Sequence, residues 1–114
     1  MTDEAKKRLL DALAACQRIS EVTKDLDFSR YEADWVLRSA VERQLEIIGE
    51  ALNRAEDERP SLREELPELR RIVGIRHRVI HGYDSVDDEI IWDVVQTKVP
   101  VLIEQLNELL GTSN

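Results

Sequence analysis

The chain has 114 residues, 24 of them acidic and 16 basic, and its formal net charge is −8. Aromatic residues make up only 4% of it, and its apolar residues are mainly Leu, Ile, Val and Ala, a composition typical of helical bundles rather than disordered chains. We expect one domain over residues 1–114. The single cysteine cannot form an internal disulfide. Membrane contact is not expected, because no apolar run nears the ~20 residues that span a bilayer.

The first predicted element is an amphipathic helix from Thr2 to about Asp25. Its start, MTDEAKKRLL, lacks the apolar core of a secretory signal, which predicts a cytoplasmic protein. Apolar residues recur three or four positions apart along the segment, the spacing of one helix face. They are Leu9, Leu10, Leu13, Cys16, Ile19, Val22 and Leu26.

A second helix is predicted to begin near Ser29 and to reach toward Arg59. Ser29 is followed three residues later by Glu32, a spacing at which each side chain can bond an amide of the first turn. A broad apolar stripe indicates that this helix contacts more than one neighbour. The stripe comprises Val36, Leu37, Ala40, Val41, Leu45, Ile48, Ala51, Leu52 and Ala55.

A short helical turn and a third helix are predicted next. Ser61 and Glu64 have the same capping spacing, in a segment with two prolines. Pro67 suits the first turn of the third helix, because its missing N–H is not needed there. Gly82 suits the C-terminal cap of that helix.

The fourth predicted helix follows Tyr83 and extends to about Leu110. Asp84 or Ser85 is expected to cap it, and Pro100 is expected to kink it because proline removes one backbone donor. Acids in its first turn are favoured by the positive end of the helix dipole. These acids of the first turn are Asp87, Asp88 and Glu89.

Four main helices with short connections predict an all-α fold, an up-and-down four-helix bundle with a short extra helical turn.

The segment between Leu69 and Tyr83 contains four arginines and two histidines but no acid. The balance for the rest of the chain is −12, so positive charge is concentrated in this one stretch. A positive patch in a negative field can select phosphate, and arginine can hold phosphate through two parallel hydrogen bonds. We therefore predict a polyanion site. Its residues are Arg70, Arg71, Arg76, His77, Arg78 and His81.

Structural interpretations of the same residues remain open. His81 can interact with the carbonyls at a helix end, and Tyr83 can be a core aromatic. His77 and His81, one turn apart, are also typical of metal ligands, with Asp84 or Asp88 as a third, but nearby arginines disfavour a divalent cation. Arg76 and Arg78 can pair with the glutamates of the second helix, Glu42, Glu46 and Glu50.

Arg76, His81 and Tyr83 have the spacing R-x4-H-x-Y, which resembles the signature of HepT-like toxins in the HEPN superfamily. The surrounding LRRIVGIRHRVIHGY and the upstream QLEIIGEAL are also similar to that family, so the resemblance covers nearly the whole chain. The chain departs from the family pattern at His77, where Asn is common, and at Leu69, where many members have Trp. The extended pattern is more specific than a bare R-x4-H match.

The resemblance implies a HEPN-type bundle and a metal-independent endoribonuclease that needs no cofactor, the toxin of a type II/VII-like toxin-antitoxin pair. It implies a homodimer whose motifs face a shared cleft, and an MntA-like nucleotidyltransferase antitoxin that silences the toxin by adenylylating Tyr83. The alternatives are a catalytically silent helical partner of a nucleotidyltransferase, binding a nucleotide or phosphate with the same arginines, and a dimeric scaffold.

The expected roles follow from the chemistry of RNA cleavage by its own 2'-hydroxyl. His81 has an ordinary pKa near 6.5, suited to proton transfer, and Arg76 can stabilise charge on the phosphate oxygens. Tyr83 is expected to bond the phosphate or orient His81, and Arg70, Arg71 and Arg78 are expected to bind RNA phosphates. The second proton-transfer group is His77 or His81 of a second protomer, and we favour the latter.

Overall fold

The computed structural model describes the backbone of residues 1–81 and 87–112 and the side chains of residues 1–75 and 87–112. Within these residues the chain forms helices and no strand, and none of the helices is long and apolar enough to cross a membrane. The elements are α1 (Asp3–Thr23), α2 (Phe28–Ala33), α3 (Trp35–Glu58), α4 (Leu62–Glu65), α5 (Leu69–His81), α6 (Asp88–Asp93), the π-helical turn η1 (Val94–Lys98) and α7 (Val99–Leu110).

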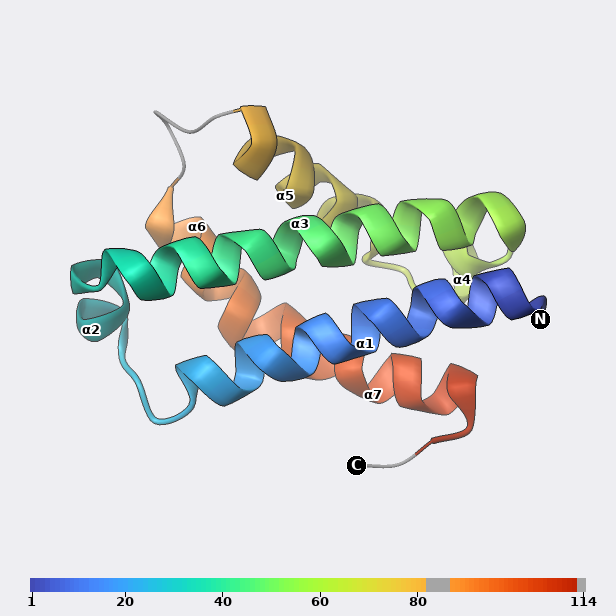
Figure 1. Ribbon diagram of the computed structural model, residues 1–114, viewed down its shortest axis with the longest axis horizontal. Coiled ribbons are helices and arrows are strands. Elements are labelled where there is room, and N and C mark those ends of the chain that lie inside the picture. Colours follow the sequence, from blue (N-terminus) through green and yellow to red (C-terminus); the bar gives the residue numbers. More distant parts are fainter. Residues whose placement is uncertain (82–86, 113–114) are drawn as a thin grey trace.

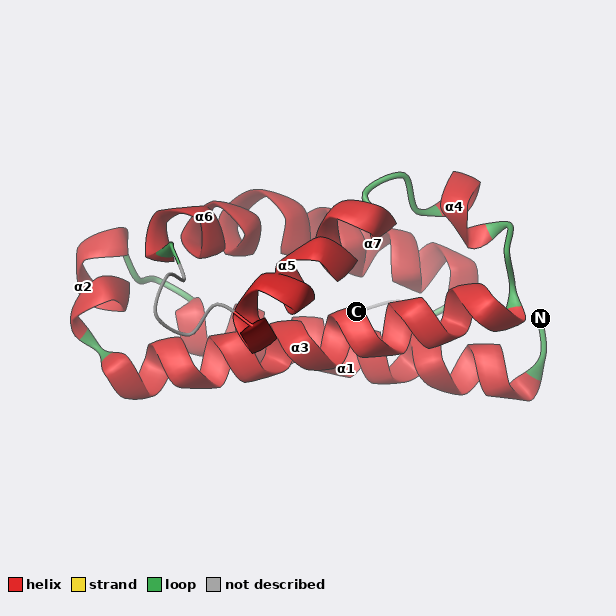
Figure 2. Cartoon of the chain, turned by 90° about the horizontal axis from the view of Figure 1, so that it is seen from above, coloured by secondary structure: helices red, strands yellow, loops and turns green. Residues whose placement is uncertain are grey.

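The long helices alternate in direction along the bundle (Figure 1). α3 runs antiparallel to α1 beside it, α5 returns over α3, and α6, η1 and α7 together form the fourth rod. Seen from above, α5 runs obliquely to α3 rather than along it (Figure 2). The predicted all-α, up-and-down four-helix fold is therefore confirmed, with α4 as the predicted extra turn.

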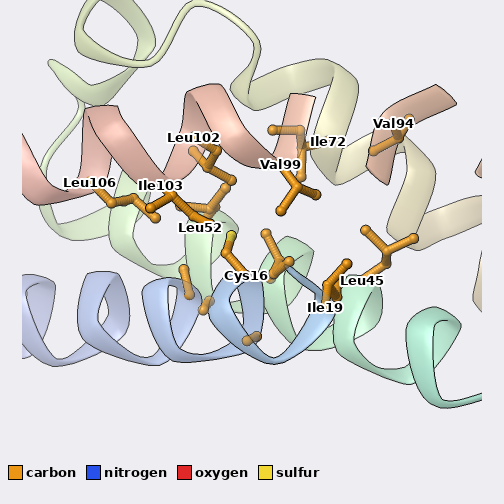
Figure 3. Packing of buried hydrophobic residues seen from close by; sticks show 14 of the residues in the cluster. Cys16, Ile19, Leu45, Leu52, Ile72, Val94, Val99, Leu102, Ile103 and Leu106 are labelled. Atoms are coloured by element: carbon orange, nitrogen blue, oxygen red, sulfur yellow. The ribbon is translucent and has the colours of Figure 1, made fainter. Parts of the chain in front are cut away.

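One apolar cluster joins the four rods (Figure 3). Each fully buried Leu or Ile stabilises the fold by about 1.5–3 kcal/mol relative to an exposed one. Cys16 is fully buried within the cluster, and burial raises the pKa of its thiol to about 12, so it is a core residue as predicted. The labelled members are Cys16 and Ile19 of α1, Leu45 and Leu52 of α3, Ile72 of α5, Val94 of η1, and Val99, Leu102, Ile103 and Leu106 of α7.

The predicted second helix is in fact two helices, α2 and α3, separated at Asp34. Asp34 leaves helical geometry, with φ −111° and ψ 95°. Its Oδ1 accepts a hydrogen bond from the Leu37 amide at 3.1 Å, while Asp27 Oδ1 accepts one from the Arg30 amide at 2.9 Å. The prediction that Ser29 caps this helix was therefore wrong, because the two aspartates flanking α2 occupy the cap positions.

The capping prediction at Ser61 was also wrong, although the short helix α4 is present. Ser61 Oγ donates a hydrogen bond to Glu65 Oε1 at 2.8 Å instead of capping the helix. Arg59 holds the same carboxylate through Nε and Nη2, at 2.8 and 2.6 Å. This ion pair fixes Glu65 within reach of Ser61 and so competes with the capping bond.

Two further differences concern the helices that flank the basic stretch. α5 begins at Leu69, two residues after Pro67, and the predicted cap at Gly82 lies outside the described residues. The cap of α6 is Asp87, whose carboxylate accepts hydrogen bonds from the Glu89 and Ile90 amides at 2.9 and 3.3 Å. Asp87 had been assigned to the first turn, after a cap at Asp84 or Ser85, so that boundary moves two or three residues along the chain.

The irregularity predicted at Pro100 appears as the π-helical turn η1 just before it. The Val99 amide donates to the Val94 carbonyl, five residues back instead of four. Pro100 has no N–H for the next bond of the helix, so the wider turn places the irregularity where a donor is already missing. The insertion still leaves Val95, Val99 and Leu102 buried against the core.

Candidate functional site

The basic stretch lies along a single helix, α5, which ends at His81. Arg70 and Arg71 occupy its first turn, and Arg76, His77, Arg78 and His81 occupy its last two turns. At 1.5 Å per residue, Arg71 and Arg76 are separated by about 7.5 Å along the helix axis. His81 is the last described residue of α5, whereas Gly82 and Tyr83 lie outside the described residues.

Arg70 and Arg71 are adjacent in sequence but have different partners. Arg70 Nη2 forms an ion pair at 3.2 Å with Glu56 Oε1 of α3, and Arg63 Nε contacts the other oxygen of that carboxylate at 2.9 Å. Glu56 is only 8% exposed, so its charge depends on these two partners. Arg70 therefore also has a structural role, joining α5 to α3.

Arg71 has no ion pair or hydrogen bond to its side chain within the described part of the chain. It is exposed and lines a groove of about 630 Å³ between α5 and α6. The α5 wall consists of Arg71, Gly74 and Ile75, and a Cβ added at Gly74 would meet nothing within 4 Å. Of the two arginines in the first turn of α5, Arg71 is therefore the better placed to contact a phosphate.

The opposite wall of this groove is acidic. Asp87, Glu89 and Asp93 line it from α6, with Ile90 and Val94. From the sequence, Asp87 and Glu89 are predicted only as acids favoured by the helix dipole, and Asp93 is not among the predicted site residues. The spacing of Glu89 and Asp93, four residues apart, was the available signal, because such residues share one helix face.

α6 is held against α2 and α3 by a polar contact at its start and an aromatic contact near its end. Arg38 Nε lies 3.7 Å from Asp88 Oδ2, and the rings of Tyr31 and Trp92 are 5.1 Å apart. The pKa of Glu42 is raised, first by burial and then by the negative charge of Asp88. These contacts fix the position of α6 against α2 and α3.

Two glutamates named above as possible partners of Arg76 and Arg78, and the two tryptophans of the chain, lie within the described residues. Glu46 pairs with Arg43 at 3.0 Å and Glu50 with Arg54 at 2.8 Å, so both acids have a partner on α3 itself. Trp92 packs against Tyr31. Trp35, in contrast, is 69% exposed, so packing within this chain does not account for it.

Comparisons with known proteins found one family model and several relatives that cover most of the chain. The family model described as "Ribonuclease HepT-like" matches residues 12–109. The chain is 35% identical over 98 residues to "Putative RNase TTE0752" of Caldanaerobacter subterraneus subsp. tengcongensis, covering 86% of this chain and 87% of that protein. It is 33% identical over 104 residues to "Probable ribonuclease HepT" of Thermococcus cleftensis, covering 91% and 94%.

A third relative is "Putative RNase MJ1380" of Methanocaldococcus jannaschii, 32% identical over 105 residues that cover 90% of this chain and 94% of the relative. No solved structure matches significantly. The family match extends over nearly all of the bundle, including the whole of α5. The chain therefore belongs to the HepT-like ribonuclease family of the HEPN superfamily.

Proposed function

We propose that the chain is a metal-independent endoribonuclease and the toxin of a toxin-antitoxin pair. The observation that carries this proposal is the R-x4-H-x-Y motif, Arg76 to Tyr83, in a chain of the HepT-like ribonuclease family. The relatives named as ribonucleases support an RNA substrate, and so does Arg71, an exposed cation without an ion pair among the described residues.

In the proposed reaction, the 2'-oxygen of RNA attacks the adjacent phosphorus while the bond from phosphorus to the 5'-oxygen breaks. A base takes the proton of the 2'-hydroxyl, and an acid gives a proton to the leaving 5'-oxygen. The products are a 2',3'-cyclic phosphate and a 5'-hydroxyl. His81 performs a proton transfer, a role typically worth about 10²- to 10⁴-fold, and Arg76 stabilises the charge on the phosphate oxygens.

One imidazole does not easily serve as base and acid in the same step, so a second group is needed. We favour His81 of a second protomer over His77, in a homodimer whose motifs share one cleft. Chains with His81→Ala should therefore depress the activity of wild-type chains when the two are mixed and allowed to exchange. Undiminished activity per wild-type chain would instead favour His77.

Tyr83 is the proposed site of adenylylation by an MntA-like nucleotidyltransferase antitoxin. Each added nucleotide brings a phosphate charge and bulk close to the arginines of α5. The modification would therefore compete with the RNA phosphate for the same cations. Intact-mass spectra of the chain, expressed with and without a neighbouring nucleotidyltransferase, test whether AMP is attached.

The test of the activity is RNA cleavage in the presence of a chelator, with Arg76→Ala and His81→Ala as inactive variants. We expect the unmodified wild type to yield cyclic phosphate ends and both variants to lose at least about 100-fold in rate. Circular dichroism should show that the variants keep their helices. Inactive wild type without added AMP would contradict the proposal and favour a catalytically silent partner of a nucleotidyltransferase.

A further inference from the structure

The groove between α5 and α6 carries unpaired charges of opposite sign on its two walls. Arg71 lies on the α5 wall, and Glu89 and Asp93 lie on the α6 wall. Within the described residues, none of these three side chains forms an ion pair or a hydrogen bond. The third acid, Asp87, differs because its carboxylate already accepts two amide hydrogen bonds at the start of α6. Among the described residues, the groove therefore offers one guanidinium without an ion pair opposite two such carboxylates.

The apolar surface of the groove comes mainly from Ile90, which is 38% exposed, because Ile75 and Val94 are only 5% and 3% exposed. Among the described residues, a Cβ added at Gly74 would meet nothing within 4 Å, so the α5 wall is open at this point. The volume of about 630 Å³ lies within the range of about 300–1,000 Å³ that is usual for small-ligand sites.

A nucleotide has complementary groups in the same arrangement. Its phosphate accepts hydrogen bonds from a guanidinium, and the faces of its base are apolar enough to pack on aliphatic side chains. Ionised carboxylates only accept hydrogen bonds, so they select base edges that donate. Guanine presents two neighbouring donors on its Watson–Crick edge, N1–H and the 2-amino group, whereas the single donor of uracil lies between two acceptors that a carboxylate repels.

We propose that this groove binds one nucleotide of single-stranded RNA, guanosine in preference to uridine, with its phosphate at Arg71 and its base edge at Glu89 or Asp93. The inference deepens the proposed function and rests on it in one respect, the position of the scissile phosphate near Arg76 and His81. Glu89 and Asp93 are then specificity-determining residues, and the bound nucleotide is a close neighbour of the cleaved bond.

The two walls explain why a nucleotide fits better than other occupants. A strand that placed phosphates along both walls would bring negative charge against Glu89 and Asp93, so only one wall can follow the backbone of the RNA. A basic peptide would be attracted to the acids but would leave the Arg71 guanidinium facing another cation. A nucleotide satisfies both walls at once.

The closing experiment measures nucleotide binding on the full chain with His81→Ala, which separates binding from cleavage. Guanosine, inosine and uridine monophosphates are titrated by heteronuclear NMR. We expect guanosine monophosphate to bind roughly tenfold or more tightly than uridine monophosphate. Inosine monophosphate, which lacks the 2-amino group, should bind with intermediate affinity.

Three further variants locate the contacts. Glu89→Gln combined with Asp93→Asn should remove the preference for guanosine. Arg71→Ala should lower the affinity of all three nucleotides by a similar factor. Glu104→Gln is the matched control, because it removes one exposed acid of α7 that does not line the groove. It should leave the affinities unchanged.

Two results would overturn the inference. If neutralising Glu89 and Asp93 raised the affinity of every nucleotide by the same factor, the two acids would act only by repelling phosphate. If an oligolysine peptide bound the groove more tightly than guanosine monophosphate, the occupant would be a basic protein segment. Failure of the wild type to cleave RNA would contradict the proposed function alone, because the titrations do not require cleavage.

Discussion

Arg70 and Arg71 show how the surroundings of a side chain decide its role. The carboxylate of Glu56 is almost fully buried and needs both Arg63 and Arg70 to offset the cost of its burial. Within the described residues, Arg71 forms no ion pair with a buried carboxylate. The sequence could not distinguish the two arginines, because Glu56 precedes them by a whole helix and its burial depends on the packing of α3 against α5.

The first prediction uses this pair as matched variants. Arg71→Ala should weaken binding of an uncleavable single-stranded RNA by about 1–2 kcal/mol, or roughly 5- to 30-fold, with little change in stability. Arg70→Ala should change RNA affinity less but lower the free energy of unfolding by about 1 kcal/mol, since Glu56 keeps only Arg63. Fluorescence anisotropy and urea denaturation measure the two effects. Equal losses of affinity would contradict the distinction.

Glu42 is a carboxylate that the fold does not favour in its charged form. Burial is the main cause of its raised pKa, the charges of Asp88 and Glu46 add to the effect, and Arg38 opposes it. The pKa of Tyr31 is raised for related reasons, and its hydroxyl is buried without a hydrogen-bond partner among the described residues. Negative charge has thus accumulated where α3 meets α6.

The second prediction concerns the pH dependence of stability. Because the pKa of Glu42 is higher in the folded than in the unfolded chain, the folded state binds this proton more tightly, and stability is lost as pH rises from the ordinary pKa through the raised one. Glu42→Gln should stabilise the protein at pH 7 by a few tenths of a kcal/mol, since solvent screens a partly exposed group. The gain should vanish at about pH 4.

Urea denaturation of wild type and Glu42→Gln at the two pH values provides the measurement. Glu104→Gln serves as a control, because it removes an exposed acid of α7, away from the contact of α3 with α6. A variant that was less stable than wild type at pH 7 would mean that the attraction between Glu42 and Arg38 outweighs burial.

Among the helices, the spacing of apolar residues predicted more of the structure than the candidate cap residues did. The apolar stripes located α1, the long α3 and the final rod, because burial of one face dominates helix stability. The break at Asp34 was missed because Asp27, Ser29 and Asp34 are all good cap residues within eight positions. Packing decided between them, since α2 is a separate short helix that buries Tyr31 beside Trp92 of α6.

The third prediction tests which of these residues caps a helix. Asp34→Ala removes the acceptor of the Leu37 amide and should lower the free energy of unfolding by about 1 kcal/mol. Ser29→Ala, five residues earlier in the same region, should cost less than about 0.5 kcal/mol, because Ser29 is exposed and caps nothing. Urea denaturation measures both losses of unfolding free energy. A larger loss for Ser29→Ala than for Asp34→Ala would support the cap at Ser29 that the sequence predicted.

The candidate site was likewise predictable only in part. Arg76, His81 and Tyr83 form a local motif that can be read along the chain, and α5 carries the first two near its end. The acidic wall of the groove was not predictable in this way. Glu89 and Asp93 line one groove with Arg71, an arrangement that depends on the tertiary fold.

The charge of the whole molecule sets how RNA binding must depend on salt. The net charge is −8, and all residues other than the four arginines of α5 sum to −12. Long-range repulsion therefore opposes RNA everywhere except at α5, so affinity must come from a few local phosphate contacts. A protein of this kind differs from a basic RNA-binding domain, in which many lysines and arginines contact successive phosphates.

The fourth prediction follows from this small number of contacts. For single strands the logarithm of the binding constant falls against the logarithm of salt concentration with a slope of about −0.7 per phosphate contacted. If Arg71, Arg76 and Arg78 each contact one phosphate, the slope should be about −2, and Arg71→Ala should reduce its magnitude by about 0.7. Glu104→Gln should leave the slope unchanged, because that side chain does not line the groove. Anisotropy titrations over a fourfold range of salt concentration give these slopes. A slope of about −5 or steeper would require phosphate contacts well beyond α5, which the acidic remainder of the surface does not provide.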